Sequence, residues 1–280
     1  MTDDFRSWIG RTETIRDDLA LTQALAAAAT LDIAPDHLAG GAALPVPWHW
    51  FYFLPRGVQS ELSIDGHPRR GGFMPPIPYP RRMFAGARLT VHAPLRLTVP
   101  AERIGEIRNV ELKSGKSGAL AFVTVGYRFV QDGALCLEEE QDIVYREPGA
   151  PVPAPVTAEW PTPPATSWSR VVTPDTRLLF RFSALTFNAH RIHYDRPYTM
   201  TEEGYPGLVV HGPLTAALLA QLAERESGRR IASFSFRGLA PLFDTAPFRL
   251  VGARTGDMVT LEAVRSDGVI AVSATATLSS

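Results

Sequence analysis

Apolar and polar residues alternate along two stretches of this chain, which predicts antiparallel strands with one face packed against a core. The clearest example is VTVGYRFV, residues 123–130, and turn signals at 114–118 and 131–133 separate it from its neighbours. A second stretch near the C-terminus follows the same plan. We expect strands within residues 87–97, 104–114, 119–131 and 134–146, and again within 233–243, 248–256, 258–266 and 269–278.

Two segments repeat their apolar residues at helical spacing instead. Thr12 to Asp32 offers a capping threonine followed by leucines and alanines, and we predict one helix over that range. The other helix has Pro213 in its first turn and ends at Gly228. Its apolar stripe consists of Leu214, Leu218, Leu219 and Leu222.

Two shorter apolar segments, Trp48 to Leu54 (WHWFYFL) and Arg177 to Leu185, are interpreted as strands. After the first of them comes DGHPRRGGFMPPIPYPRRMFAG, residues 65–86, whose prolines and glycines cannot sustain a helix or a central strand. Loops of that length inside a compact chain are often functional, so we treat this one as a candidate.

Proline density marks one boundary in the chain. Residues 147–164 (EPGAPVPAPVTAEWPTPP) favour an extended conformation and predict a semi-rigid linker. This linker divides the chain into an N-terminal domain, 1–146, and a C-terminal domain, 165–280. Each half holds one long helix and several antiparallel strands, so we predict an α+β fold.

Composition limits the function classes without selecting one. With 280 residues, 45% of them hydrophobic, the chain can bury a large core, and a net charge of −1 argues against nucleic acid and anionic membrane as partners. Cys136 is the only cysteine, and the first residues, MTDDFRSWIGRTET, have neither signal-peptide nor transit-peptide character. The longest apolar run nearby is too short to span a bilayer. We therefore expect a cytoplasmic protein.

Polar groups crowd one short stretch between a predicted strand and a glycine-proline turn. Polar groups placed there must be paired or face a cavity, which leaves a functional and a purely structural role equally open. A metal site is the less favoured interpretation, because the spacing of the candidate ligands His190, His193, Asp195 and His211 matches no compact zinc signature. The stretch contains Asn188, His190, Arg191, His193, Tyr194 and Asp195.

The Gly212-Pro213 pair starts the predicted C-terminal helix directly after an apolar run. The N–H groups of a first helical turn, with the helix dipole behind them, suit a developing oxyanion. An ordinary helix start, with glycine for turn geometry, is the alternative.

At these residues the chain resembles a known family. FNAHRIHYD (187–195), followed by GLVVHGPLTAALL (207–219), resembles the MaoC-like hot-dog family, also called the R-specific enoyl-CoA hydratase 2 group. The family pattern is Asp-x-Asn-Pro-aliphatic-His, followed by a glycine turn into a central helix. On this chain the catalytic aspartate falls on Asn188, the Asn-Pro pair on His190 and Arg191, the aliphatic residue on Ile192, the histidine on His193 and the glycine on Gly212.

The resemblance implies a double hot-dog, two units joined as a pseudo-dimer, with catalysis in the C-terminal half. It further implies that water held by Asn188 and His193 adds to the β-carbon of an unsaturated acyl-CoA thioester, while the Gly212 N–H stabilises the thioester oxygen. An asparagine amide can only position water, so His193 would carry the proton, with Asp195 as a support. No cofactor is implied beyond the CoA of the substrate.

Arginines bracket the rigid PPIPYP segment of the long loop. Guanidinium groups suit CoA phosphates or a distal substrate carboxylate, and a solvated surface loop is the alternative. Phe73, Met74 and Tyr79 line an acyl pocket or simply pack. The candidates for substrate contact are Arg69, Arg70, Arg81, Arg82, His190, Arg191, Tyr194 and His211.

This loop and the chain length resemble a narrower branch, that of itaconyl-CoA and 3-methylfumaryl-CoA (mesaconyl-C4-CoA) hydratases and of mitochondrial-type hydroxyacyl-thioester dehydratases. The branch implies a short branched dicarboxylyl-CoA as substrate and a homodimer or larger assembly. Three alternatives stay open: a dehydratase acting on 3-hydroxyacyl carrier protein, a non-catalytic acyl-CoA-binding protein, and a thioesterase, whose acidic residue would have to be Glu224.

Overall fold

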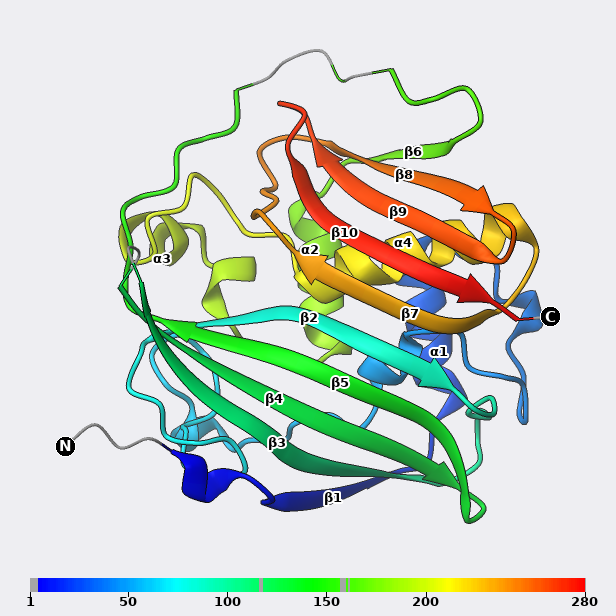
Figure 1. The fold of residues 1–280 in the computed structure, drawn as a ribbon, viewed down its shortest axis with the longest axis horizontal. Coiled ribbons are helices and arrows are strands. Elements are labelled where there is room, and N and C mark those ends of the chain that lie inside the picture. Colours follow the sequence, from blue (N-terminus) through cyan, green and yellow to red (C-terminus); the bar gives the residue numbers. More distant parts are fainter. Residues whose placement is uncertain (1–4, 116–117, 157–159, 161, 280) are drawn as a thin grey trace.

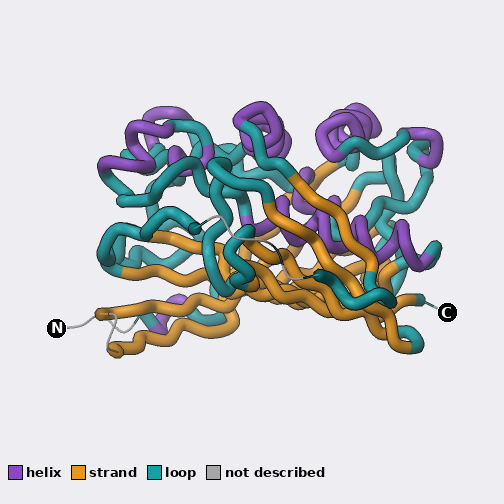
Figure 2. Tube along the Cα trace, turned by 90° about the horizontal axis from the view of Figure 1, so that it is seen from above, coloured by secondary structure: helices purple, strands orange, loops and turns teal. Residues whose placement is uncertain are grey.

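The computed structural model describes residues 5–115, 118–156, 160 and 162–279. Four α-helices lie on one side of a large sheet (Figure 2). The helices are α1 (Leu21–Leu31), α2 (Thr176–Leu185), α3 (Arg196–Thr201) and α4 (Gly212–Ser227), and the 3-10 helices are η1 (Arg6–Trp8), η2 (Pro35–His37), η3 (Trp48–Phe51), η4 (Gln59–Glu61) and η5 (Arg191–His193). The strands are β1 (Thr12–Asp17), β2 (Arg81–Val91), β3 (Ala101–Gly115), β4 (Gly118–Gln131), β5 (Ala134–Arg146), β6 (Trp168–Val172), β7 (Ile231–Gly238), β8 (Phe248–Thr255), β9 (Met258–Arg265) and β10 (Ile270–Leu278).

All ten strands belong to one antiparallel sheet, in the order β1-β3-β4-β5-β2-β7-β10-β9-β8-β6. The strands of the two halves meet where β2 pairs with β7, from Gly86 opposite Arg237 to Thr90 opposite Ser233 (Figure 1). The second half of the sheet curves around α4, which packs against β6 to β10. This arrangement confirms the predicted α+β double hot-dog, with the two units fused into a continuous sheet.

The alternating pattern identified most strands correctly because one face of the sheet is buried. In β4, Val123, Val125 and Phe129 are almost completely buried, whereas Thr124 and Arg128 between them are more exposed. The central helix is also confirmed: all four leucines of its predicted stripe are buried, and Gly228 ends it in the left-handed conformation, φ +67°.

The predicted helix over Thr12 to Asp32 is wrong in its first third. Thr12–Asp17 forms β1, paired with β3 at the edge of the sheet, and the helix begins only at Leu21. The segment TETIRD alternates between exposed and half-buried positions, as an edge strand does, and its β-branched residues favour that state.

The two segments interpreted as strands are helical instead. Trp48–Phe51 forms η3. Trp48, His49 and Phe51 are all buried there, so buried and exposed residues do not alternate along the segment. Residues 176–185 form α2, capped by Asp175, whose carboxylate accepts the Leu178 N–H. Strand β6 and the first residues of β2 are additional elements that the sequence pattern missed.

The long loop is confirmed only in part, because its last six predicted residues, 81–86, belong to the central strand β2. The described residues of 147–164 form no helix or strand, and the domain division at this segment stays our proposal. Residues 65–80 form a loop that ends where β2 begins at Arg81. Within the described residues, no helix is long and apolar enough to cross a membrane.

Candidate active site

A loop of the N-terminal half docks on the polar stretch of the C-terminal half. The Arg191 backbone N–H donates to the Asp65 carbonyl at 2.8 Å, and the Arg191 guanidinium donates to the Ile64 carbonyl at 3.1 Å. Gly66 lies directly against Ala189. The candidate site is therefore assembled from both halves of the chain, at residues more than a hundred positions apart.

Gly66 makes this close approach possible. Its φ is +92°, and a Cβ built on it would lie 1.7 Å from the carbonyl oxygen of Ala189. Only glycine has neither the steric penalty at that φ nor the clash. A hollow of about 290 Å³ opens beside this contact, and its wall includes Arg191 and Tyr194, two of the predicted substrate-contacting residues.

Four histidine rings form a row behind the docked loops. The His67 and His190 ring centroids are 4.1 Å apart, those of His190 and His193 5.4 Å, and those of His193 and His211 3.6 Å, stacked nearly parallel. The far end of the row is held by Ser183 of α2, whose hydroxyl lies 2.9 Å from His211 Nε2. His67 comes from the N-terminal half and the other three come from the C-terminal half.

His193 is held as a neutral base. Its Nδ1–H donates to the Val209 carbonyl at 2.7 Å, which leaves Nε2 as an unprotonated acceptor. Burial lowers its pKa to about 4, against the opposing effect of the Val209 carbonyl. The ring is therefore uncharged at neutral pH and can accept a hydrogen bond or a proton.

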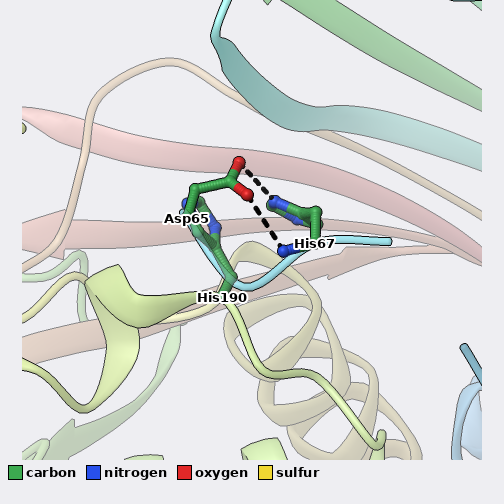
Figure 3. Close-up of side chains that lie close together, drawn as sticks. All are labelled: Asp65, His67 and His190. Carbon is green, nitrogen blue, oxygen red and sulfur yellow. Dashed lines mark hydrogen bonds and ion pairs between the residues drawn. The ribbon is translucent and has the colours of Figure 1, made fainter. Parts of the chain in front are cut away.

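A carboxylate-imidazole pair stands at the other end of the row. Asp65 accepts both the Nδ1–H and the backbone N–H of His67, each at 3.0 Å (Figure 3). Burial raises the pKa of Asp65, but these hydrogen bonds outweigh it and the pKa lies below its usual value. Burial lowers the pKa of His67, although Asp65 opposes the shift. A charged carboxylate thus orients a neutral imidazole.

Burial keeps the whole row uncharged, and repulsion between its members adds to that effect. Burial lowers the pKa of His190 far below its ordinary value, and His67, His193 and the Arg82 charge lower it further. Burial and His193 likewise hold the pKa of His211 well below normal. One added proton would raise the free energy of adding another, so the row can hold a single transient charge.

The uncharged row predicts acid-sensitive stability. Folded pKa values lie below the unfolded value of about 6.5, so below that pH the unfolded chain binds protons that the fold excludes. Stability should fall as pH drops from about 6.5 towards 4, by about 1.4 kcal/mol per pH unit for each such histidine. Thermal denaturation of His190→Gln should show a shallower pH slope than wild type, while His92→Gln, on the surface, should keep it. Equal slopes in all three proteins would contradict this electrostatic picture.

Asn188 lies in the turn that leads to this row. Its Oδ1 accepts the His190 backbone N–H at 3.0 Å, which fixes the turn and leaves the amide NH₂ to donate. Asp195 does not orient His193. Its carboxylate accepts from the Arg191 guanidinium and from the Tyr198 N–H that starts α3, so the Val209 carbonyl has the orienting role considered for Asp195.

Gly212 begins α4 immediately after His211, whose ring stacks on His193. Among the described residues, the Gly212 N–H has no hydrogen-bond acceptor. The Phe84 carbonyl oxygen lies on the Cβ side of Gly212, 3.7 Å from where a Cβ built on this residue would be. A free N–H at a helix N-terminus therefore lies beside the histidine row, as an oxyanion site requires.

The predicted arginine cluster divides into four different roles. Arg70 donates to the carbonyls of Ile77, Tyr79 and Pro80 and so holds its own loop together. Arg81 is buried and pairs with Glu203 at 3.1 Å, which joins the two halves. Arg69 is exposed. Half-buried Arg82 has no hydrogen bond or ion pair with any residue that the structure describes, and its charge lowers the pKa of both His67 and His190.

One group of side chains has the spacing of metal ligands. Asp65, His67 and His190 offer ligand atoms within 4.8 Å of one another (Figure 3). This group shares only His190 with the metal interpretation of the sequence. The Asp65 carboxylate is already engaged by His67, and the positive charge of Arg82 opposes a cation. These features suit proton transfer better than metal binding.

Sequence reasoning overlooked Asp65 and His67. Attention in that loop went to its arginines, and the histidine lies 123 positions from His190 along the chain. The usable signal was the tripeptide Asp65-Gly66-His67, in which a glycine with positive φ separates a carboxylate from an imidazole. Its partners in the other half became visible only in the folded structure.

The chain and its fold are similar to several known proteins. Residues 47–244 match the family model of hydroxyacyl-thioester dehydratase type 2. The chain is 64% identical over 275 residues to a mesaconyl-C(4)-CoA hydratase of Chloroflexus aurantiacus, covering 98% of both chains. It is 29% identical to a mitochondrial hydroxyacyl-thioester dehydratase type 2 of Schizosaccharomyces pombe, covering 75% of this chain and 78% of that one. A solved MaoC-like dehydratase shares the fold, with a TM-score of 0.75 at 15% identity, covering 98% of this chain and 99% of that chain.

Proposed function

The chain belongs to the hydroxyacyl-thioester dehydratase type 2 family, and from this membership we propose that it is a hydro-lyase that adds water to an α,β-unsaturated acyl-CoA thioester. The observation that carries the proposal is His193, a buried neutral imidazole with Nδ1 committed to the Val209 carbonyl and Nε2 left as an acceptor. The free N–H of Gly212 lies next to it in the fold. Water activation and oxyanion stabilisation are the two tasks that hydration requires.

The reaction follows from these positions. The attacking water donates a hydrogen bond to His193 Nε2, and the Asn188 NH₂ donates to its oxygen. That oxygen bonds to the β-carbon while a proton leaves it for an imidazole, and the π electrons move onto the thioester oxygen beside the Gly212 N–H. A preorganised donor at such an oxygen typically contributes about 10²–10³-fold in rate. Protonation of the α-carbon completes the addition, and dehydration is the same path reversed.

The substrate class we propose is a short branched dicarboxylyl-CoA. Its support is the similarity to the mesaconyl-C(4)-CoA hydratase and the position of Arg82, whose half-buried guanidinium has no partner among the described residues. A half-buried guanidinium without an ion-pair partner can donate charge-assisted hydrogen bonds to a substrate carboxylate. We propose no cofactor beyond the substrate's own CoA, and a homodimer or larger assembly of double hot-dog chains.

Arg82→Met should remove the preference for dicarboxylyl substrates. Loss of a charge-assisted hydrogen bond is expected to raise the KM for mesaconyl-C4-CoA about 10–100-fold. The KM for crotonyl-CoA, which has no distal carboxylate, should be unchanged. Steady-state kinetics of both substrates, with exposed Arg69→Met as the matched control, would measure this; an equal loss on both substrates would contradict the assignment of Arg82.

The proposed activity is tested with purified protein and mesaconyl-C4-CoA, itaconyl-CoA and crotonyl-CoA. Hydration removes the enoyl thioester absorbance, and we expect the fastest loss with a dicarboxylyl substrate. A protein that binds these thioesters but never changes their absorbance would be the non-catalytic alternative.

A further inference from the structure

The proposed reaction lacks a counter-ion for the transferred proton at His193. A proton taken by that ring would create an imidazolium that is completely buried, next to a backbone carbonyl and stacked on His211. Asn188 has no charge, and the Asp195 carboxylate is engaged by Arg191. An uncompensated buried cation is unfavourable by several kcal/mol, so His193 alone is a poor place to hold the proton.

The Asp65–His67 pair has the charge that His193 lacks. Asp65 fixes the His67 tautomer through Nδ1–H and leaves Nε2 as the acceptor, so the carboxylate can stabilise an imidazolium when one forms. The His67 ring lies against the His190 ring, with the two centroids 4.1 Å apart (Figure 3). His190 links the two bases, because its ring centroid is 4.1 Å from that of His67 and 5.4 Å from that of His193.

We propose that His67, oriented by Asp65, is the acid-base residue of the site. It transfers the proton that an asparagine at position 188 cannot transfer. This inference rests on the proposed hydration. As the water oxygen bonds to the β-carbon, one O–H bond breaks and its proton goes to His67 Nε2. Asp65 stabilises the imidazolium while the negative charge rests on the thioester oxygen. The N–H bond then breaks, its proton bonds to the α-carbon, and the enolate electrons form that C–H bond. His193 and Asn188 hold the water in place.

The groups around His67 determine its pH dependence. Asp65 favours the imidazolium, whereas burial, Arg82 and Arg70 favour the neutral ring, and His190 faces it without charge. His67 must be neutral to accept the proton, so kcat/KM should fall as pH drops through its pKa in the free enzyme. Removing the Asp65 charge would lower that pKa and move the acid limb to lower pH.

The experiment compares His67→Gln, Asp65→Asn and wild type with mesaconyl-C4-CoA. His67→Gln should lower kcat about 10²–10⁴-fold with little change in KM. Asp65→Asn, which keeps the side chain's shape, should lower kcat and move the acid limb of kcat/KM by about one pH unit towards acid. A merely structural role would leave that limb in place. The matched control is His92→Gln, which breaks a surface histidine-carboxylate pair of 2.9 Å, and it should behave as wild type.

The outcomes separate this inference from the proposed function. If wild type hydrates the substrate while His67→Gln keeps its kcat, or if the acid limb of Asp65→Asn does not move, the pair is not the acid-base unit. If wild type never hydrates an enoyl thioester, the proposed function itself fails. Dialysis of wild type against a chelator should leave kcat unchanged. A loss of kcat that added zinc restores would instead make the same residues a metal site. Thermal denaturation checks that each variant is folded.

Discussion

Gly66→Ala is expected to separate the two docked loops and to lower turnover at least about a hundredfold, because a shift of 1 Å at a reacting group can cost that much. The new Cβ would lie 1.7 Å from the Ala189 carbonyl oxygen and 2.6 Å from its carbon, both backbone atoms that cannot rotate away. The φ of +92° adds backbone strain of about 1–3 kcal/mol. His67 would move with the loop, away from His190.

A second glycine of the same loop separates the effect of the Gly66–Ala189 contact from the effect of backbone strain. Gly71 has a φ of +98°, but a Cβ there would meet nothing closer than 3.8 Å. Gly71→Ala should therefore cost stability through its backbone alone and leave kcat near that of wild type. Thermal denaturation and kcat measured on both variants decide the matter. Equal effects of the two substitutions would mean that the loop contact has no role in the site.

His193→Ala is expected to lower kcat about 10³-fold or more, since it removes the acceptor that holds the attacking water. His193→Gln should lose less, because its amide can donate to the Val209 carbonyl and still offer Oε1 as an acceptor to the water. Both variants should still bind substrate, since the proposed contact of Arg82 with the substrate carboxylate is untouched. Single-turnover kinetics with isothermal titration of a saturated acyl-CoA separates binding from chemistry.

His193 is also part of the stacked row, so stability needs its own measurement. Removing the ring leaves His211 without its stacking partner at 3.6 Å, and some loss of thermal stability is expected. Activity that persists in a folded His193→Ala protein would remove this residue from the mechanism. Comparison with His67→Gln then shows whether water binding and proton transfer are separate tasks.

The sheet was predictable from the sequence because its pattern reports burial directly. Strands β4 and β10 alternate between a buried and a more exposed face, and the glycine turn after α4 needs only local geometry. The helical segments 48–51 and 176–185 were not predictable in this way. Their aromatic and aliphatic residues are buried by contacts with distant elements, such as Phe51 against Phe182, so composition alone favoured strands.

The candidate site was predictable only where its residues are close in sequence. His193, Asn188 and Gly212 fall within one local motif, which the polar stretch and the helix start indicated. His67 joins them through the docking of two halves, and no short-range pattern encodes that contact, whereas Arg82 was among the arginines that the sequence proposed for substrate contact. Arg70 and Arg81 resembled ligand-binding residues in the sequence, but the fold engages them with loop carbonyls and with Glu203.

The most direct test of hydration at this site is the reaction in ¹⁸O-labelled water, followed by mass spectrometry of the acyl-CoA product. Incubation of wild type with mesaconyl-C4-CoA should give an intact thioester that is heavier by one labelled water, with no free CoA, and His193→Ala should form this product at least about a thousandfold more slowly. Release of free CoA with the label in the acid would make the protein a thioesterase. An unlabelled, unchanged substrate would contradict hydration altogether.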